Sequence, residues 1–332
     1  MKRILGALLV LLMIVGVAGC SNTAQVQKNQ ENLDTKQIRL GIIQIVEHPA
    51  LDAAREGFLD NLAAKGYKEG QDLVVEYENA QGDQSNLQTI SRKLVQDKCD
   101  LILAIATPSA VAMANATSEI PILITAVTDP VSAKLVESNE KPGTNVTGTN
   151  DMNPVKDQLK LIKDIVPAAK NVGIIYNSSE VNSQVQLKIA DQVAPELGLN
   201  LIKVTVTASS EVMQAAQSLV GRVDAIYLPT DNMVISSISS VIKVAEENKI
   251  PIIAGESNSV ETGALATIGI DYYKLGQTTA EMAVRVINGE KPQDMAIQGQ
   301  AGTDLVINLK AAEKMGVTIP EDILARAKNV IK

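Results

Sequence analysis

Aromatic side chains and histidine are scarce in this chain of 332 residues. It has no tryptophan, one phenylalanine, six tyrosines and a single histidine, His48. One histidine cannot supply a histidine-rich metal site or a histidine-based proton relay elsewhere in the chain, and we expect no bound metal. The sequence also lacks a Gly-x-Ser-x-Gly elbow, a P-loop, a Cys-x-x-Cys pair and a glycine-rich dinucleotide turn. We therefore expect no catalytic residue, no cofactor and no enzyme activity.

Cysteine is also rare, and one of the two cysteines has a distinctive position. Cys20 follows a basic tip, an apolar run over residues 4–17 and the small pair Ala18-Gly19. This order is typical of a secretory signal peptide, and the run is shorter than the roughly 20 residues that a spanning helix needs. A cysteine just after the small residues resembles the bacterial lipoprotein signal, which implies cleavage after residue 19 and lipid on Cys20. An ordinary signal peptide with an incidental cysteine is the alternative.

Removal of residues 1–19 changes the charge and the thiol content. The net charge of −8 becomes −10 when Lys2 and Arg3 are lost. This acidic balance argues against nucleic acid and against a basic membrane-binding surface. Attachment to a membrane then depends on lipid, and a diacylated cysteine holds more firmly than a single acyl chain. Cys99 is the thiol that remains, so no intrachain disulfide can form, and we expect it to be a buried structural thiol.

The remainder of the chain has a short polar segment and a long alternating region. Residues 20–37 read as a flexible tether because they are polar and show no apolar period. From residue 38, apolar β-rich runs alternate with amphipathic stretches, which is typical of βαβ units and parallel sheets. The predicted strands are 39–46, 73–78, 100–106, 120–125, 171–176, 200–206, 224–228, 250–254 and 304–307. The predicted helices are 49–65, 85–96, 108–117, 154–165, 182–197, 210–220, 233–248, 275–288 and 310–316.

The two halves of the alternating region resemble each other weakly. Residues 100–108 parallel 224–231, and residues 119–124 parallel 249–254. The mature chain is also longer than one hydrophobic core usually serves. We therefore predict an α/β fold with two doubly wound parallel-sheet lobes. The chain is expected to cross from one lobe to the other at residues 142–151 and 267–272.

Ligands of open α/β sheets bind outside the carboxyl ends of the strands, so the residues at those ends are the candidate ligand contacts. They are unusually polar for a chain of this composition. The predicted ligand-binding residues are Gln44, Glu47, His48, Thr107, Ser109, Thr125, Val127, Thr128, Asp129, Tyr176, Asn177, Thr230, Asp231, Asn232, Glu256 and Asp271.

These side chains suit the parts of a zwitterion. Thr107 and Ser109 stand at a predicted helix start, where free N–H groups favour a carboxylate, and Thr128 adds a hydroxyl. Tyr176 is the candidate for an apolar or stacking wall. The carboxylates that could accept hydrogen bonds from an ammonium group are Glu47, Asp129, Asp231 and Glu256.

Each candidate also has a purely structural interpretation. Thr107 and Ser109 are ordinary helix-capping types, and Asp231-Asn232 has the same character before the next helix. Residues 47–49 could cap the first helix, and Asp129-Pro130 could be a turn alone. Asp271 fits a hinge or cap better than a ligand contact. A metal at His48 would have a nearby glutamate as its only obvious companion.

Several short motifs together resemble one known family. They are residues 46–52 (VEHPALD), 80–83 (AQGD), 106–110 (ATPSA), 125–130 (TAVTDP), 227–232 (YLPTDN), 263–267 (GALAT) and 269–273 (GIDYY). They resemble the ABC-transporter substrate-binding lipoproteins of the tryptophan/tyrosine type. The resemblance implies a type I periplasmic-binding-protein fold, with two lobes joined by three crossings that close on a small ligand. On this basis we expect a signal peptide at 1–19, a tether at 20–37, lobe 1 at 38–148 plus 275–302, and lobe 2 at 149–274 plus 303–332.

The same resemblance implies a function and partners. It implies an extracytoplasmic, lipid-anchored protein that binds an aromatic amino acid and delivers it to an ABC permease and its ATPase, and we expect a monomer. A looser likeness to branched-chain amino-acid-binding proteins implies that Ser109 and Thr128 hold the carboxylate and help hold the amine, and that Glu256 completes the ammonium site. A sugar or nucleoside ligand, or a ligand-sensing lipoprotein, is the alternative.

Overall fold

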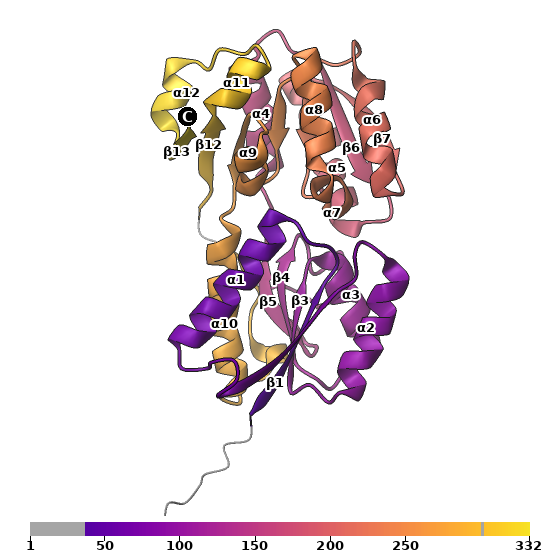
Figure 1. Cartoon of the computed structure of the whole chain (residues 1–332), viewed down its shortest axis with the longest axis vertical. Helices are drawn as coiled ribbons and strands as arrows, with labels where there is room; N and C mark the ends of the chain where they lie inside the picture. The colour runs from indigo at the N-terminus through magenta and orange to yellow at the C-terminus, as the bar shows by residue number, and fades with distance from the viewer. Residues whose placement is uncertain (1–36, 300–301) are drawn as a thin grey trace, which may run out of the picture. The chain divides into compact units, whose positions relative to one another are not determined.

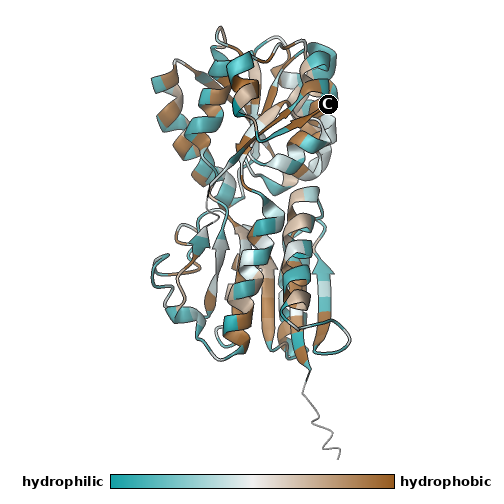
Figure 2. Ribbon diagram, turned by 90° about the vertical axis from the view of Figure 1, so that its left-hand side faces the viewer, coloured by the Kyte–Doolittle hydropathy of each residue, from teal (hydrophilic) through white to brown (hydrophobic). Residues whose placement is uncertain are grey.

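The computed structural model describes residues 37–299 and 302–332 (Figure 1). The predicted signal peptide, Cys20 and the tether up to residue 36 lie outside the described residues. None of the helices in the described ranges is long and apolar enough to cross a membrane. Figure 2 shows apolar residues concentrated in the strands and on the helix faces that cover them.

The first sheet contains six strands in the order β11-β5-β4-β3-β1-β2, and every pair in it is parallel. Its strands are β1 (Ile38–Gln44), β2 (Leu73–Asn79), β3 (Leu101–Ile105), β4 (Ile122–Val127), β5 (Val146–Asn150) and β11 (Gln298–Gly299). Its helices are α1 (Pro49–Ala64), α2 (Gln84–Gln96), α3 (Thr107–Ala116), α10 (Tyr272–Ile287) and the short 3-10 turn η3 (Pro292–Asp294). We call this sheet and its helices lobe 1. Strands β3 and β4 are buried throughout, as expected for the centre of a parallel sheet covered on both faces.

The second sheet contains seven strands in the order β13-β12-β10-β9-β8-β6-β7, all parallel except the β10–β12 pair. Its strands are β6 (Asn171–Asn177), β7 (Asn200–Val206), β8 (Ala225–Leu228), β9 (Ile252–Ala254), β10 (Ala266–Gly269), β12 (Asp304–Asn308) and β13 (Asn329–Ile331). Its α-helices are α4 (Val155–Ile165), α5 (Val181–Val193), α6 (Val212–Leu219), α7 (Asn232–Ser236), α8 (Ile238–Asn248), α9 (Ser257–Thr262), α11 (Leu309–Lys314) and α12 (Glu321–Arg326). Two 3-10 turns, η1 (Ala194–Leu197) and η2 (Ser209–Glu211), complete the set that we call lobe 2.

Each lobe has its own hydrophobic core, as the two-lobe prediction requires. The chain passes between the sheets after β5, after β10 and between β11 and β12. Helix α10 follows a strand of lobe 2, yet its buried residues join the core of lobe 1, where it lies against α1 (Figure 1). Cys99 belongs to the same core, so the prediction of a buried thiol is confirmed.

Some predicted elements differ from those observed. Residues 142–151 and 267–272 were expected to be connections, but they contain strands β5 and β10. These strands are short and rich in threonine and glycine, so no apolar run marks them. The helix predicted over 233–248 is interrupted at Ser237, where α7 ends and α8 begins.

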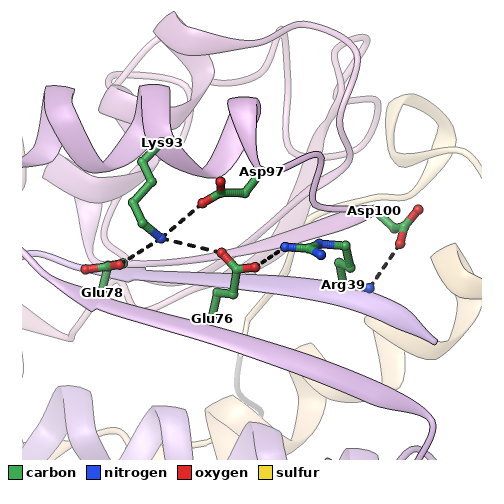
Figure 3. A network of polar contacts seen from close by, with 6 residues as sticks. All are labelled: Arg39, Glu76, Glu78, Lys93, Asp97 and Asp100. Atoms are coloured by element: carbon green, nitrogen blue, oxygen red, sulfur yellow. Dashed lines mark hydrogen bonds and ion pairs between the residues drawn. The ribbon is translucent and has the colours of Figure 1, made fainter.

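The exposed edge of lobe 1 carries a charged network on β2, the last strand of the sheet (Figure 3). Lys93 Nζ lies 3.0 Å from a carboxylate oxygen of Glu78 and 3.5 Å from one of Glu76, while Glu76 also pairs with Arg39. Asp97 and Asp100 complete the network, through Lys93 and the Arg39 backbone N–H respectively. Because these side chains are partly exposed, we assign the network to protection of an edge strand from unwanted pairing and not to a binding site.

Candidate functional site

A small cavity lies where loops at the strand ends of the two lobes meet. Lobe 1 and the crossings contribute His48, Ala50, Leu51, Ala126, Thr128, Asp151 and Tyr272. Lobe 2 contributes Asn182, Thr230, Asp231, Asn232, Ile235 and Glu256. The free volume is ≈ 20 Å³, which is space for about one water molecule. The lobes are therefore nearly closed on each other at this point.

Two of the larger and more open cavities reach Glu180 near the small one. The first, of ≈ 460 Å³, runs between α2 and α3 and reaches Glu180 at the start of α5. The second, of ≈ 450 Å³, lies between residues 81–85 of lobe 1 and 207–209 of lobe 2, and Glu180 also borders it. Glu180 thus lies at the boundary of both open cavities.

The small cavity is rich in acids and has no basic partner for them. Asp151, Asp231 and Glu256 line it, whereas no lysine or arginine is among the described residues of its wall. His48 is the sole basic side chain there, and burial lowers its pKa to about 4, so the ring is neutral at pH 7. Such a cavity favours a ligand that carries positive charge.

Two of these carboxylates cap helices and accept three hydrogen bonds each. Asp231 precedes α7 and accepts the Val234 N–H at 3.0 Å, the Asn177 N–H at 2.6 Å and the Ser183 hydroxyl at 2.6 Å. Burial raises the pKa of Asp231 although these hydrogen bonds oppose it.

Glu256 is occupied in the same manner before α9. It accepts the Asn258 N–H at 2.5 Å, the Ser259 N–H at 2.9 Å and the Ser259 hydroxyl. Burial raises its pKa to about 7, because the three hydrogen bonds only partly offset the desolvation of the charge.

Glu180 connects the starts of α5 and α7. Its carboxylate accepts hydrogen bonds from Asn182 Nδ2 at 2.8 Å, Asn232 Nδ2 at 2.5 Å and the Met233 N–H at 3.2 Å. Burial, and then the nearby charge of Asp231, raise its pKa to about 8. We therefore expect Glu180 to be largely protonated at neutral pH in this closed arrangement.

Asp151 differs from the other acids because one of its oxygens is free. It follows β5 directly, and its Oδ2 accepts the hydroxyl of Tyr272, the first residue of α10. The buried Oδ1 makes no hydrogen bond of good geometry with another described residue, although the Thr128 hydroxyl lies close enough to the carboxyl group to oppose the effect of burial on its pKa. Burial raises the pKa of Asp151. Asn182 Oδ1 is another unpartnered acceptor in the same wall.

Backbone strain marks the ends of the two central strands of lobe 1. Ala106 follows β3 with φ 75° and ψ 155°, and Ala126 near the end of β4 has φ 56°. The Ala106 conformation is one that glycine almost alone adopts, and such strain gathers at ligand sites. It leads directly into Thr107, whose buried hydroxyl and that of Ser109 have no partner among the described residues.

The structure brings six of the predicted site residues to the wall of the small cavity. They are His48, Thr128, Thr230, Asp231, Asn232 and Glu256. Thr107 lines the adjoining cavity between α2 and α3, and Asn177 borders the other open cavity while its N–H binds Asp231. Ser109 is buried in the first turn of α3 and is not among the residues that line a cavity.

The remaining predicted residues lie outside the small cavity. Gln44 is buried and contacts Asp52 and Arg55, at 2.9 Å and 3.0 Å, while Glu47 is exposed and accepts the Tyr77 hydroxyl. The others have structural surroundings. Val127 belongs to the core of lobe 1, Tyr176 packs against the core of lobe 2, and the Thr125 hydroxyl accepts a hydrogen bond from that of Thr149. Asp129 accepts the backbone N–H groups of residues 131 and 132, and Asp271 accepts that of Lys274 at the start of α10.

The cavity wall also contains Asp151, Asn182 and Tyr272, which were not predicted from the sequence. Asp151 and Tyr272 fall in segments that were assigned only as connections. The signal for them was available, because a connection between lobes that close on a ligand must pass beside that ligand. Asn182 was not predicted because it is the first residue of a predicted helix, where asparagine is common for structural reasons.

Comparison with known proteins gives a family and close relatives. The family model described as ABC transporter substrate binding protein matches residues 39–331. The chain is 47% identical over 313 residues to a tyrosine-binding protein of Clostridioides difficile (strain R20291), which covers 92% of this chain and 90% of the relative.

Two solved structures are informative because their conformations differ. An ABC domain from Streptococcus pneumonia in complex with L-Trp is 39% identical, has a TM-score of 0.86 and covers 89% of this chain and 100% of that one. The ligand-free, open structure of a substrate-binding protein with adhesive properties from Clostridium difficile is 48% identical, yet its TM-score is 0.66, with 89% and 99% covered. More distant solute-binding proteins, at 13% and 19% identity, share the type I periplasmic-binding-protein fold alone, with TM-scores of 0.57 and 0.61.

Proposed function

Since this chain belongs to the family of ABC transporter substrate-binding proteins, we propose that it captures a zwitterionic amino acid between its lobes. The proposed ligand is an aromatic amino acid, namely tryptophan, tyrosine or phenylalanine. The relatives support this choice, because one is a tyrosine-binding protein and another was solved with L-Trp.

The observation that carries the proposal is the charge of the cavity wall. Three buried acids and no lysine or arginine line it, so an ammonium group is the natural complement. For the carboxylate of the ligand we propose the start of α3, where Thr107 borders the cavity between α2 and α3 and its buried hydroxyl is unpartnered. The Ser109 hydroxyl is also buried and unpartnered, but it lines no described cavity in this closed arrangement. A sugar or nucleoside is the alternative ligand. It is favoured less, since Tyr272 is the one aromatic residue in the described wall and its hydroxyl is engaged with Asp151.

The proposed mechanism is closure about the three crossings. A free volume of ≈ 20 Å³ is far too small for an amino acid, so the ligand must enter while the lobes are apart. Ligand contacts that exist only in the closed form then shift the population toward closure. The low TM-score to the open relative, despite its higher sequence identity, supports a motion of this kind.

The setting of this function is proposed as follows. The protein is extracytoplasmic, anchored by diacyl lipid on Cys20, monomeric and not an enzyme, and it delivers its ligand to an ABC permease and ATPase. The proposed division of the chain is 38–148 plus 275–302 for lobe 1 and 149–274 plus 303–332 for lobe 2. Strand β5 ends at Asn150 and helix α10 begins at Tyr272, so both extend slightly past these bounds. A ligand-sensing lipoprotein is the alternative, and permease and ATPase genes beside its own would favour transport.

A thermal-shift screen of the mature domain, from residue 34 onward, tests the proposal. Because a ligand that binds only the folded state stabilises it by mass action, we expect tryptophan, tyrosine or phenylalanine to raise the melting temperature. At 100 times the Kd the stabilisation is about 2.7 kcal/mol. Isothermal titration would then give the affinity. A rise with sugars or nucleosides alone would contradict the amino-acid assignment, and no rise from a ligand-free sample would favour the sensor.

A further inference from the structure

We propose that Asp151 is the residue that accepts the ammonium group of the ligand, and that Tyr272 positions it for this role. The inference rests on the proposed function and makes it more specific. It replaces Glu256, to which the family resemblance assigned the ammonium group, by a residue in the first crossing between the lobes.

The three acids in the wall differ in how many hydrogen bonds they already accept. Glu256 accepts three donors from its own helix start, and Asp231 accepts three from Asn177, Ser183 and Val234. Any ammonium group would have to compete with these donors. Asp151 Oδ1, by contrast, is buried in the wall with no partner among the described residues.

An unpartnered carboxylate oxygen is costly in a buried wall. The Tyr272 hydroxyl satisfies Oδ2, but no opposite charge offsets the desolvated charge of the carboxylate, which destabilises the closed state. An ammonium group removes this cost, because it supplies both a positive charge and N–H donors. Asn182 Oδ1, a second unpartnered acceptor in the wall, is available for another of the three N–H groups.

Tyr272 determines which oxygen remains free. Its hydroxyl donates to Asp151 Oδ2, and its side chain is almost fully buried. Asp151 follows β5 in the first crossing, whereas Tyr272 begins α10 after the second. The hydrogen bond therefore joins two of the three connections between the lobes. An ammonium group held by Asp151 contacts the moving part of the molecule directly, which couples ligand capture to closure.

The first experiment compares the affinity of Asp151→Asn and of the unaltered protein for L-tyrosine, L-tryptophan and L-phenylalanine by isothermal titration. Loss of one side of a buried charge pair should weaken binding by about 100-fold. Asp224→Asn is the matched control, since its carboxylate accepts the Lys170 and Asn171 N–H groups away from every cavity wall described above, and its affinity should stay unchanged. Glu256→Gln should lose less affinity than Asp151→Asn. A larger loss in Glu256→Gln would overturn the inference.

A second measurement separates ammonium recognition from a general structural effect. Whichever amino acid binds best is compared with its analogue that lacks the amino group, such as 3-(4-hydroxyphenyl)propanoate for tyrosine. The unaltered protein should prefer the amino acid by about 100-fold, and Asp151→Asn should reduce this preference to within a few-fold. A preference that persists in Asp151→Asn would overturn the inference while the proposed function stands. If the unaltered protein binds no amino acid at all, the proposed function itself is wrong.

Tyr272→Phe provides an independent variant in case Asp151→Asn does not fold. It removes a single hydroxyl, so the carboxylate remains but is no longer fixed. Because one hydrogen bond to the carboxylate is lost, we expect about a tenfold loss of affinity for the amino acid and no change for the analogue that lacks the amino group. Equal changes for both ligands would show that Tyr272 acts on folding or closure alone, and would overturn its assigned positioning role.

Discussion

At the scale of single residues, the acids of the cavity are held by N–H groups and hydroxyls rather than by opposite charges. Asp231 and Glu256 each cap the start of the short helix that follows them. Glu180, which is distant in the sequence, also accepts an N–H group at the start of α7. Such hydrogen bonds stabilise a buried carboxylate but do not neutralise it, so burial still raises the pKa of all three groups. The wall is thus well ordered and still favours a cation.

The strained backbone at Ala106 gives a prediction about stability. Ala106→Gly should raise the free energy of unfolding by about 1 kcal/mol. The strain removed is roughly 1–3 kcal/mol, and the added chain entropy of glycine offsets about 0.5–1 kcal/mol of it. Urea denaturation of the ligand-free protein measures the change. As a control, Ala114→Gly lies within α3, where helical φ is ordinary, and should destabilise by about 1 kcal/mol. A loss of stability in Ala106→Gly would show that the strain is not present in solution.

The sequence could predict this wall only in part. Asp231, Asn232 and Glu256 follow strongly apolar strands, so their place at the carboxyl edge was predictable. A carboxylate at this edge can accept the N–H groups of the helix that follows it, or it can keep an oxygen free for a ligand. The sequence spacing does not tell these two cases apart, because they differ only in side-chain geometry. Asp151 follows the weak strand β5, where neither apolar pattern nor cap signal points to a cavity.

At the scale of elements, the contact between α1 and α10 joins helices that are more than 200 residues apart in the sequence. It is unusually close because glycine stands on both sides. A Cβ on Gly276 would lie 1.9 Å from the Ala54 carbonyl oxygen, and one on Gly57 would lie 2.0 Å from that of Tyr273. Both helices could be predicted from their apolar periodicity, but no local pattern reveals that they meet.

Gly276→Ala therefore should destabilise lobe 1. The added methyl group forces the two helices apart, and overpacking of this kind costs about 1–3 kcal/mol or somewhat more. The midpoint of urea unfolding, read by circular dichroism, measures the loss. Thr278→Ala is the matched control on the same helix, because Thr278 is only half-buried and its hydroxyl bonds within the helix. It should change stability by less than about 0.5 kcal/mol. Equal stability of both variants would contradict the close contact.

At the scale of the whole molecule, two lobes with separate cores meet at one group of buried acids. We call this group the acidic seam, and its members are Asp151, Glu180, Asp231 and Glu256. The alternation of strands and helices predicted both parallel sheets, since buried strands such as β3 and β8 are continuous apolar runs. The crossings were less predictable, because β5 and β10 gain their stability from pairing within the sheets and not from their own apolar content. The seam arises only when both lobes are assembled, so its electrostatics belong to the folded, closed molecule.

The acidic seam gives the stability of the ligand-free protein a distinct pH dependence. Glu256 has a pKa of about 7 and Glu180 of about 8 in the folded state, against 4.5 for both in an unfolded chain. The folded state thus binds their protons more tightly, and the stability this provides is lost as the pH rises through 7 and 8. His48 acts in the opposite direction, since its folded pKa of about 4 lies below its model value of 6.5, but its effect is confined below pH 6.5.

Above pH 6.5 the carboxyl groups alone decide the slope, so the free energy of unfolding should fall by about 2–3 kcal/mol between pH 6.5 and 8.5. Urea denaturation at several pH values in that window measures the slope. In the double variant Glu180→Gln and Glu256→Gln the two titrating groups are absent, and the slope should flatten. Stability that stays constant in this window would contradict the raised pKa values of the ligand-free protein, because carboxyl groups that are hydrated between open lobes titrate as they do in the unfolded chain. In that case a saturating amino-acid ligand, which closes the lobes, should change the pH dependence of the complex relative to the free protein.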